Sequence, residues 1–160
     1  MTEIVMPNDT NPLHNLMGGN LMRWMDMAAG MCAGRHCESY VVTASVDHVS
    51  FQLPIPLGDV VTIKATVTRT FNTSLEVYVE VYADSIKGGK ARRCNNAYFT
   101  FVAVDEKTMK PCNIPAVVPL TKDEQNQFDS AKRRRELRLI LSGRMKPTDA
   151  ADLRSIFLGE

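Results

Sequence analysis

Cysteine is scarce in this sequence and follows no ligand spacing. The chain has four cysteines, Cys32, Cys37, Cys94 and Cys112, and they do not form the closely spaced pairs of a zinc site. We therefore expect reduced thiols, with Cys32 in the core, and no metal. A disulfide or a zinc site is the less favoured alternative.

Long hydrophobic runs are also missing. No apolar stretch approaches the ~20 residues that a transmembrane helix needs, and the amino terminus lacks the basic-then-apolar pattern of a secretory signal. An excess of one charge is missing too, because 19 Lys and Arg nearly balance 18 Asp and Glu, for a net charge of +1. We expect a cytoplasmic protein that binds neither nucleic acid nor membrane, so any anionic ligand must meet a local basic patch.

The pattern of a serine hydrolase is absent as well. The chain has no GxSxG segment, and its three histidines show no common arrangement with a serine or cysteine nucleophile. We expect packing or solvent roles for His36 and His48, while His14 is a weak candidate for substrate contact.

The segment from Gly18 to Gly34 predicts a buried helix. It is apolar on every side, which is typical of a helix in the centre of a structure, and its only charged side chains are Arg23 and Asp26. Burying a carboxylate costs several kcal/mol, so Asp26 is expected to be paired, protonated or chemically employed. The alternative is a surface ion pair with Arg23, worth only ~0.2–0.5 kcal/mol.

Four segments after this helix have strand character. Residues 40–51 and 91–104 are rich in β-branched or aromatic residues, and residues 61–68 and 75–82 alternate apolar with polar side chains. The faces expected inside are Val61, Ile63, Ala65 and Val67 on one strand and Leu75, Val77, Val79 and Val81 on the next. Short turns predict that the last three strands are antiparallel neighbours, in an α+β domain whose curled sheet wraps the helix.

With 160 residues, 44% of them hydrophobic, the chain is long enough for one domain with a core, which we assign to residues 1–120. We assign residues 121–160 to a helical extension. A weakly amphipathic helix begins at Thr121, carries the basic run 132–135 and is broken by Gly143 and Pro147. A last short helix is predicted from Asp149 to Leu158, with Thr148 as its cap.

Several motifs follow one another in order along residues 5–120. They are Met6-Pro7-Asn8-Asp9-Thr10-Asn11, Gly18-Gly19, Trp24-Met25-Asp26, and the segments 42–47, 58–61 and 97–105. Together they resemble the hotdog-fold acyl-CoA thioesterases, of the short single-domain bacterial type related to the tandem-domain acyl-CoA hydrolases of animals. The departures are a short strand before Pro7, His14-Asn15 where relatives often carry glycine, and the carboxy-terminal extension.

The resemblance implies an enzyme that hydrolyses acyl-CoA to a carboxylate and coenzyme A, with no cofactor beyond the coenzyme A of its substrate. It places Asp26 as general base or nucleophile and Asn11 as the residue that holds the attacking water or the thioester carbonyl. It also implies a site completed by a loop of the partner subunit, hence a homodimer as the minimal unit, in a tetramer or hexamer. Asn11 has an alternative role in an Asx turn before Pro12.

Gly18 and Gly19 suit an oxyanion site. Glycine lets a ligand approach the backbone closely, and the first N–H groups of a helix carry the positive end of its dipole, so Gly19 N–H is expected to contribute to an oxyanion hole. The alternative is that the paired glycines form a tight turn and nothing more.

Coenzyme A also needs a phosphate site. Arg92 and Arg93, with Lys87 and Lys90, form one basic group and residues 132–135 another, although most charge runs are solvated faces. The resemblance implies pantetheine contacts at Thr73 and Ser74. Met22, with other methionines and Phe51, is expected to line the acyl pocket, but its depth and the preferred chain length do not follow from the sequence.

Two other functions remain open at this point. A hotdog dehydratase or hydratase acts on the same thioesters, but such enzymes usually carry a catalytic histidine near the helix, where this chain has Asp26. A ligand-sensing hotdog domain binds acyl-CoA without turnover, and it is expected to lack the acid or to carry a DNA-binding segment.

Overall fold

The structure is a computed structural model, and it describes residues 1–153. It divides into a first unit, Met1–Ala116, and a second unit that begins at Val117. The domain boundary predicted after residue 120 stays a prediction. The elements of the first unit are β1 (Thr2–Ile4), α1 (Gly18–Cys37), β2 (Tyr40–Phe51), β3 (Asp59–Thr70), β4 (Ser74–Ser85) and β5 (Arg92–Val104), with a 3₁₀ turn at Pro7–Asp9.

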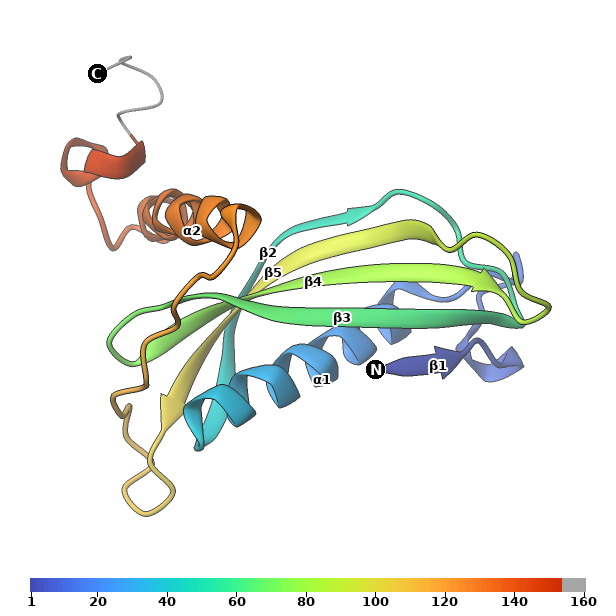
Figure 1. The fold of residues 1–160 in the computed structure, drawn as a ribbon, viewed down its shortest axis with the longest axis horizontal. Helices are drawn as coiled ribbons and strands as arrows, with labels where there is room; N and C mark the ends of the chain where they lie inside the picture. Colours follow the sequence, from blue (N-terminus) through green and yellow to red (C-terminus); the bar gives the residue numbers. More distant parts are fainter. Residues whose placement is uncertain (154–160) are drawn as a thin grey trace. The chain divides into compact units, whose positions relative to one another are not determined.

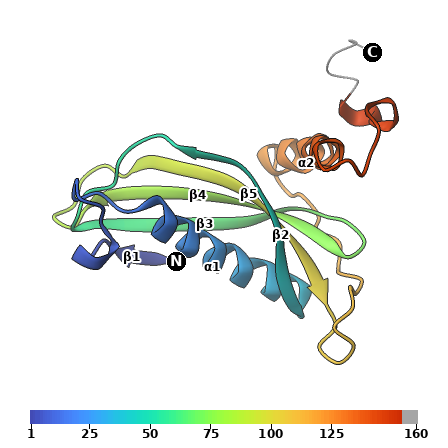
Figure 2. The same ribbon diagram turned by 180° about the vertical axis from the view of Figure 1, so that it is seen from behind.

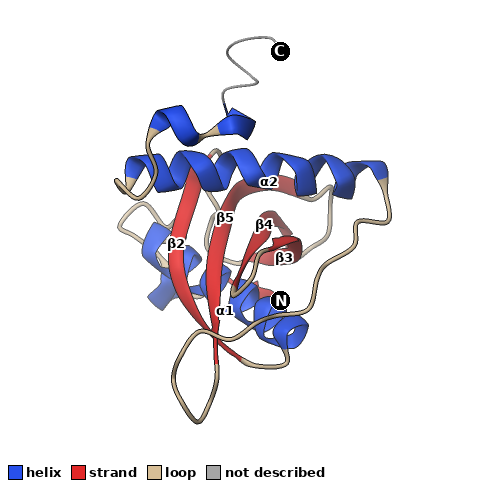
Figure 3. Cartoon of the chain, turned by 90° about the vertical axis from the view of Figure 1, so that its left-hand side faces the viewer, coloured by secondary structure: helices blue, strands red, loops and turns tan. Residues whose placement is uncertain are grey.

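Five antiparallel strands form one sheet in the order β1-β3-β4-β5-β2. The sheet curves around α1, which runs along its concave face (Figures 1 and 2). Strand β2 is the long edge strand and lies beside β5 (Figure 3). The predicted α+β hotdog fold is confirmed, as is the short strand expected before Pro7.

The core lies between the inner face of the sheet and one stripe of α1. The stripe repeats every three or four residues, as a helix packed on one side requires, and consists of Leu21, Trp24, Met25, Ala28, Ala29, Ala33 and Cys37. The sheet contributes fully buried side chains from its two central strands, Leu75, Val77, Val79 and Val81 on β4 and Ala97, Phe99, Phe101 and Ala103 on β5. Burying each large apolar side chain stabilises the fold by about 1.5–3 kcal/mol.

Helix α1 differs from the prediction in two respects. It is buried on one side only, because Met27 and Met31 are 43% and 50% exposed in the single chain. It also ends at Cys37 rather than at Gly34, and Glu38 closes it in the left-handed conformation with φ of 50°. Its hydrophobic outer side therefore does not contact the sheet of its own chain.

The outer face of the sheet also departs from simple alternation. Thr68 and Glu76 were expected to face water, but both are buried, and Thr68 Oγ1 donates a hydrogen bond of 2.6 Å to Glu76 Oε1. The register of β3 and β4 shifts between Val67 and Arg69. Strand β4 keeps its two-residue period here, because Leu75 and Val77 are buried on the inner face on either side of Glu76. The register shift therefore does not account for the burial of Glu76, which the sequence pattern did not reveal.

The second unit contains α2 (Lys122–Leu141). Its start is a capping box, in which Thr121 and Glu124 each bind the backbone N–H of the other. Gly143 follows the helix with φ of 70°, as its predicted role as a helix breaker requires. The helix predicted from Asp149, with Thr148 as its cap, starts differently: Pro147–Asp149 forms a 3₁₀ turn capped at Lys146. The rest of that prediction, residues 154–158, lies outside the described residues. Neither α1 nor α2 is long and apolar enough to cross a bilayer.

Candidate active site

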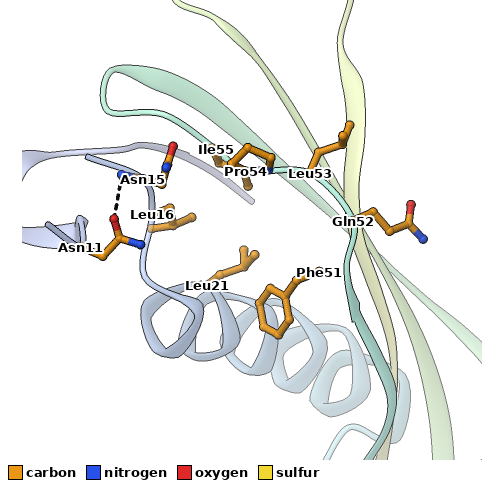
Figure 4. A pocket seen from close by; sticks show the side chains of 9 residues that line it. All are labelled: Asn11, Asn15, Leu16, Leu21, Phe51, Gln52, Leu53, Pro54 and Ile55. Carbon is orange, nitrogen blue, oxygen red and sulfur yellow. Dashed lines mark hydrogen bonds between the residues drawn. The ribbon is translucent and has the colours of Figure 1, made fainter. Parts of the chain in front are cut away.

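A pocket of about 260 Å³ opens beside the amino-terminal end of α1. Its walls come from the loop before α1, from the first turn of α1 and from the segment that leaves β2 (Figure 4). The lining residues are Asn11, Asn15, Leu16, Leu21, Phe51, Gln52, Leu53, Pro54 and Ile55. The pocket is therefore largely apolar, with a few amide groups, which is typical of a site for a small molecule with an apolar part.

Asn11 combines a structural contact with an open donor. Its Oδ1 accepts hydrogen bonds from the backbone N–H groups of Leu13 (2.9 Å) and Asn15 (3.2 Å), so the Asx turn considered from the sequence is present. Among the described residues, its Nδ2 has no hydrogen-bond partner, and Figure 4 shows this nitrogen turned toward the pocket. The turn fixes the amide in one orientation and leaves two N–H donors for a ligand.

The start of α1 presents further free donors. Met17 precedes the helix and provides no side-chain cap, and the first bonded N–H is that of Leu21, which donates to Met17 O at 3.0 Å. Within the described part of the chain, the N–H groups of Gly18, Gly19 and Asn20 have no acceptor. A Cβ at Gly19 would meet no atom within 4 Å, whereas one at Gly18 would lie 3.3 Å from the Phe51 ring. Gly19 therefore leaves open space for a ligand at the helix terminus.

Asp26 lies farther along α1, about 12 Å from Gly18 at the usual helical rise. It is half-buried, not enclosed as expected, and it makes no ion pair with Arg23. Its Oδ1 accepts a hydrogen bond of 2.8 Å from Thr43 Oγ1 on β2. Asp26 does not line the pocket that contains Asn11, so one protomer does not bring these two residues together.

Thr43 is a site residue that the sequence reasoning missed. It is paired with the buried Phe101 in the β2–β5 register, so its side chain lies on the face of the sheet that carries α1. The one available signal was that β2 follows α1 directly, which places the start of β2 beside the helix. The hydroxyl orients the Asp26 carboxylate and leaves its other oxygen available.

The residues expected to bind coenzyme A lie at two separate places. Thr73 is in the turn before β4 and Ser74 is the first residue of β4, while Arg92 pairs with Ala83 near the opposite end of that strand. Arg92 donates to the Asp59 carboxylate, and this hydrogen bond raises the pKa of Arg92 above its ordinary value. Arg93 contacts Glu80 at 3.4 Å and the Tyr78 hydroxyl. The roles of these residues in ligand binding stay predictions.

Met22, the other predicted pocket residue, is half-buried on α1 and packs against the core, but it does not line this pocket.

The thiols and histidines do not form a second site. All four cysteines are free, as expected, although Cys32 is half-buried rather than in the core. Burial raises the pKa of the Cys32, Cys37 and Cys94 thiols, which favours their unreactive protonated form. Among the described residues, no three His, Cys, Asp or Glu side chains are grouped to hold a metal ion.

Comparison with known proteins identifies the family. A family model described as "Thioesterase superfamily" matches residues 13–90. The uncharacterized acyl-CoA thioester hydrolase YkhA of Bacillus subtilis is 38% identical over 133 residues, which cover 83% of this chain and 77% of YkhA. The crystal structure of an apo-hexameric acyl-CoA thioesterase superposes with a TM-score of 0.85 at 37% identity and covers 89% of this chain and 90% of that one. The chain belongs to the hotdog-fold acyl-CoA thioesterases.

A third similar protein bears on individual residues. The acyl-CoA hydrolase of Staphylococcus aureus, solved with butyryl coenzyme A and coenzyme A, has a TM-score of 0.81 at 36% identity, over 89% of this chain and 88% of that one. Its solved structures include alanine variants at an asparagine, an aspartate and a threonine. The asparagine precedes the aspartate by 15 positions and the threonine follows it by 17, the same intervals that separate Asn11, Asp26 and Thr43.

Proposed function

We propose that this protein hydrolyses acyl-CoA thioesters, with Asp26 as the general base or nucleophile. The observation that carries the proposal is the Asp26 carboxylate on α1, oriented by Thr43 Oγ1 at 2.8 Å, in a chain of this family. Asn11 and Gly19 supply N–H donors toward the thioester. The coenzyme A of the substrate is the only cofactor-like group that the reaction needs.

The chemistry follows from these groups. Donors from Asn11 Nδ2 and Gly19 N–H would stabilise the oxyanion that forms on the thioester carbonyl. In the direct route, Asp26 takes a proton from water as the water oxygen bonds to the carbonyl carbon. The carbon–sulfur bond then breaks, and the coenzyme A thiolate takes up that proton. In the alternative route, Asp26 bonds to the carbonyl carbon, the carbon–sulfur bond breaks, and coenzyme A leaves as the thiolate. Water then hydrolyses the resulting anhydride, which regenerates the Asp26 carboxylate and supplies the proton that the thiolate takes up.

A complete site on this proposal requires two copies of the chain. Among residues 1–153, no strand pairs with the outer edge of the twelve-residue strand β2, which exposes Val42, Val49 and Phe51 by 50%, 37% and 57%. A long apolar edge strand is a surface for pairing with another strand. We propose a homodimer in which Asn11 of one copy and Asp26 of the other serve one thioester, within a tetramer or hexamer in the cytoplasm.

The Asp26→Asn variant tests the proposed function. Its amide has nearly the shape of the carboxylate but cannot act as a base, so turnover of acyl-CoA should fall by about 10²–10⁴-fold. Asp105→Asn is the matched control, because Asp105 lies beyond the end of β5 and bonds only to its own turn. Release of free thiol from purified protein measures the rate, and circular dichroism checks the fold.

Near-normal hydrolysis by folded Asp26→Asn protein would remove Asp26 from the mechanism. Tight acyl-CoA binding by the wild type without any turnover would instead favour a binding domain of the same fold.

A further inference from the structure

One buried amide on the inner face of the sheet has no partner. Asn95 lies on β5, where it continues the inward alternation of Ala97, Phe99 and Phe101, and it is 0% exposed. Among the described residues, neither its Nδ2 nor its Oδ1 has a hydrogen-bond partner. Buried amides in folded proteins are nearly always satisfied, so this one requires an explanation.

Asn95 is next to a wall of the pocket. Its directly opposite partner on β2 is Phe51, a pocket residue, and opposite residues of an antiparallel pair share one face with their Cβ atoms about 5 Å apart. The backbone N–H groups of Gln52 and Leu53, also pocket residues, donate to Cys94 O at 3.0 and 3.4 Å. The segment that forms the wall is therefore attached to β5 at the position beside Asn95.

Phe51 is opposite Asn95 in the sheet and is also close to the start of α1. Its ring packs on Gly18 at the start of α1, yet the residue is 57% exposed in the single chain. Phe51 therefore has to change rotamer before a ligand can reach Asn95. Rotation of Phe51 would open the pocket from the Gly19 N–H toward the Asn95 amide.

We propose that Asn95 forms the polar end of the acyl pocket and selects acyl groups that carry a hydroxyl or keto oxygen beyond the thioester. This inference rests on the proposed function. The amide offers both donor and acceptor atoms, so it matches a neutral oxygen function. A carboxylate would require a buried cation, and Arg92, three residues before Asn95, is occupied by Asp59.

The test compares two substrate series in the full-length protein. One is a short-chain saturated series from butyryl-CoA to octanoyl-CoA, and the other contains the hydroxyacyl-CoA thioesters of the same lengths. A site built to bind a hydroxyl discriminates strongly against the analogue that lacks it, so wild-type kcat/KM should be at least about tenfold higher for the hydroxylated member at the best length.

The variant Asn95→Leu should reverse this preference, because leucine has a similar volume and no polar atom. Asn113→Leu is the control for the same substitution, since Asn113 is exposed, follows β5 and does not line the pocket. The control should keep the wild-type ratio. If Asn95→Leu does not fold, the wild-type ratio decides the question by itself.

Equal or better hydrolysis of the saturated series by the wild type would overturn the role of Asn95 and leave the proposed function intact. An unchanged ratio in folded Asn95→Leu protein would overturn it as well. If the wild type hydrolyses only longer saturated thioesters such as palmitoyl-CoA, the inference is wrong and the proposed function stands. If it hydrolyses no acyl-CoA at all, both are wrong.

Discussion

The hydrogen bond between Thr43 and Asp26 explains how a carboxylate is accommodated in the middle of α1. The sequence predicted that this acid is paired, protonated or employed, and the structure gives it a hydroxyl donor rather than a cation. A neutral donor orients a carboxylate without neutralising it. The second oxygen of Asp26 is left for the proton transfer or the attack that a base or nucleophile performs.

Removing this hydroxyl should slow the chemical step. Hydrogen bonds to charged groups contribute about 1.5–3 kcal/mol, so Thr43→Val should lower kcat by about ten- to a hundredfold with little change in KM. Thr43→Ser keeps the hydroxyl and should keep most of the activity. Steady-state kinetics on one acyl-CoA measures both variants, and wild-type kcat in Thr43→Val would mean that Thr43 has no positioning role.

The residue types of the site were more predictable than their contacts. Asp26 could be singled out from its chemistry, as an acid among apolar residues. Asn11 was assigned by the family resemblance, and Gly19 by its place at a helix start together with that resemblance. Thr43 could not be singled out, because its hydroxyl meets Asp26 only once β2 is placed against α1. For the same reason, the sequence did not reveal that Arg92 is paired with Asp59, a contact between the ends of two different strands.

At the scale of elements, the long strands were predictable and their irregularities were not. Alternation over residues 61–68 and 75–82 fixed the inner faces of β3 and β4. Alternation did not predict the register shift near Arg69, nor the burial of Thr68 and Glu76 beside it. The sequence of α1 also does not show which of its faces is left exposed, because apolar residues occur on every side of the helix.

A substitution at the carboxy-terminal end of α1 should stabilise the fold. Glu38 closes the helix with φ of 50°, a conformation that costs a side-chain-bearing residue roughly 1–2 kcal/mol, partly offset in glycine by greater freedom of the unfolded chain. Glu38→Gly should therefore stabilise the fold by about 0.5–1 kcal/mol and raise Tm by about 1–4 °C.

Calorimetry checks this value, with Glu38→Ala as the control. Alanine keeps the unfavourable φ, so its Tm should not rise. A lower Tm for Glu38→Gly than for the wild type would show that the Glu38 side chain itself stabilises the helix end.

At the scale of the whole molecule, the single chain is incomplete in two ways. In the described part of the chain, the sheet ends in the unpaired edge of β2, and the outer α1 surface leaves Met27 and Met31 exposed. Its Asn11 pocket and its Asp26 carboxylate are also separate. A second copy of the chain would cover the exposed edge and helix surface and would supply the missing half of each site.

Subunit complementation tests this shared site most directly. Asn11→Ala and Asp26→Ala proteins should each be inactive alone, whereas a mixed dimer contains one intact Asn11–Asp26 pair. With complete random exchange, half of the dimers are mixed and each has one good site of two. About a quarter of the wild-type activity should then return, if the two sites act independently. Mass spectrometry verifies the exchange, and no recovery in verified mixed dimers would contradict a site built from two chains.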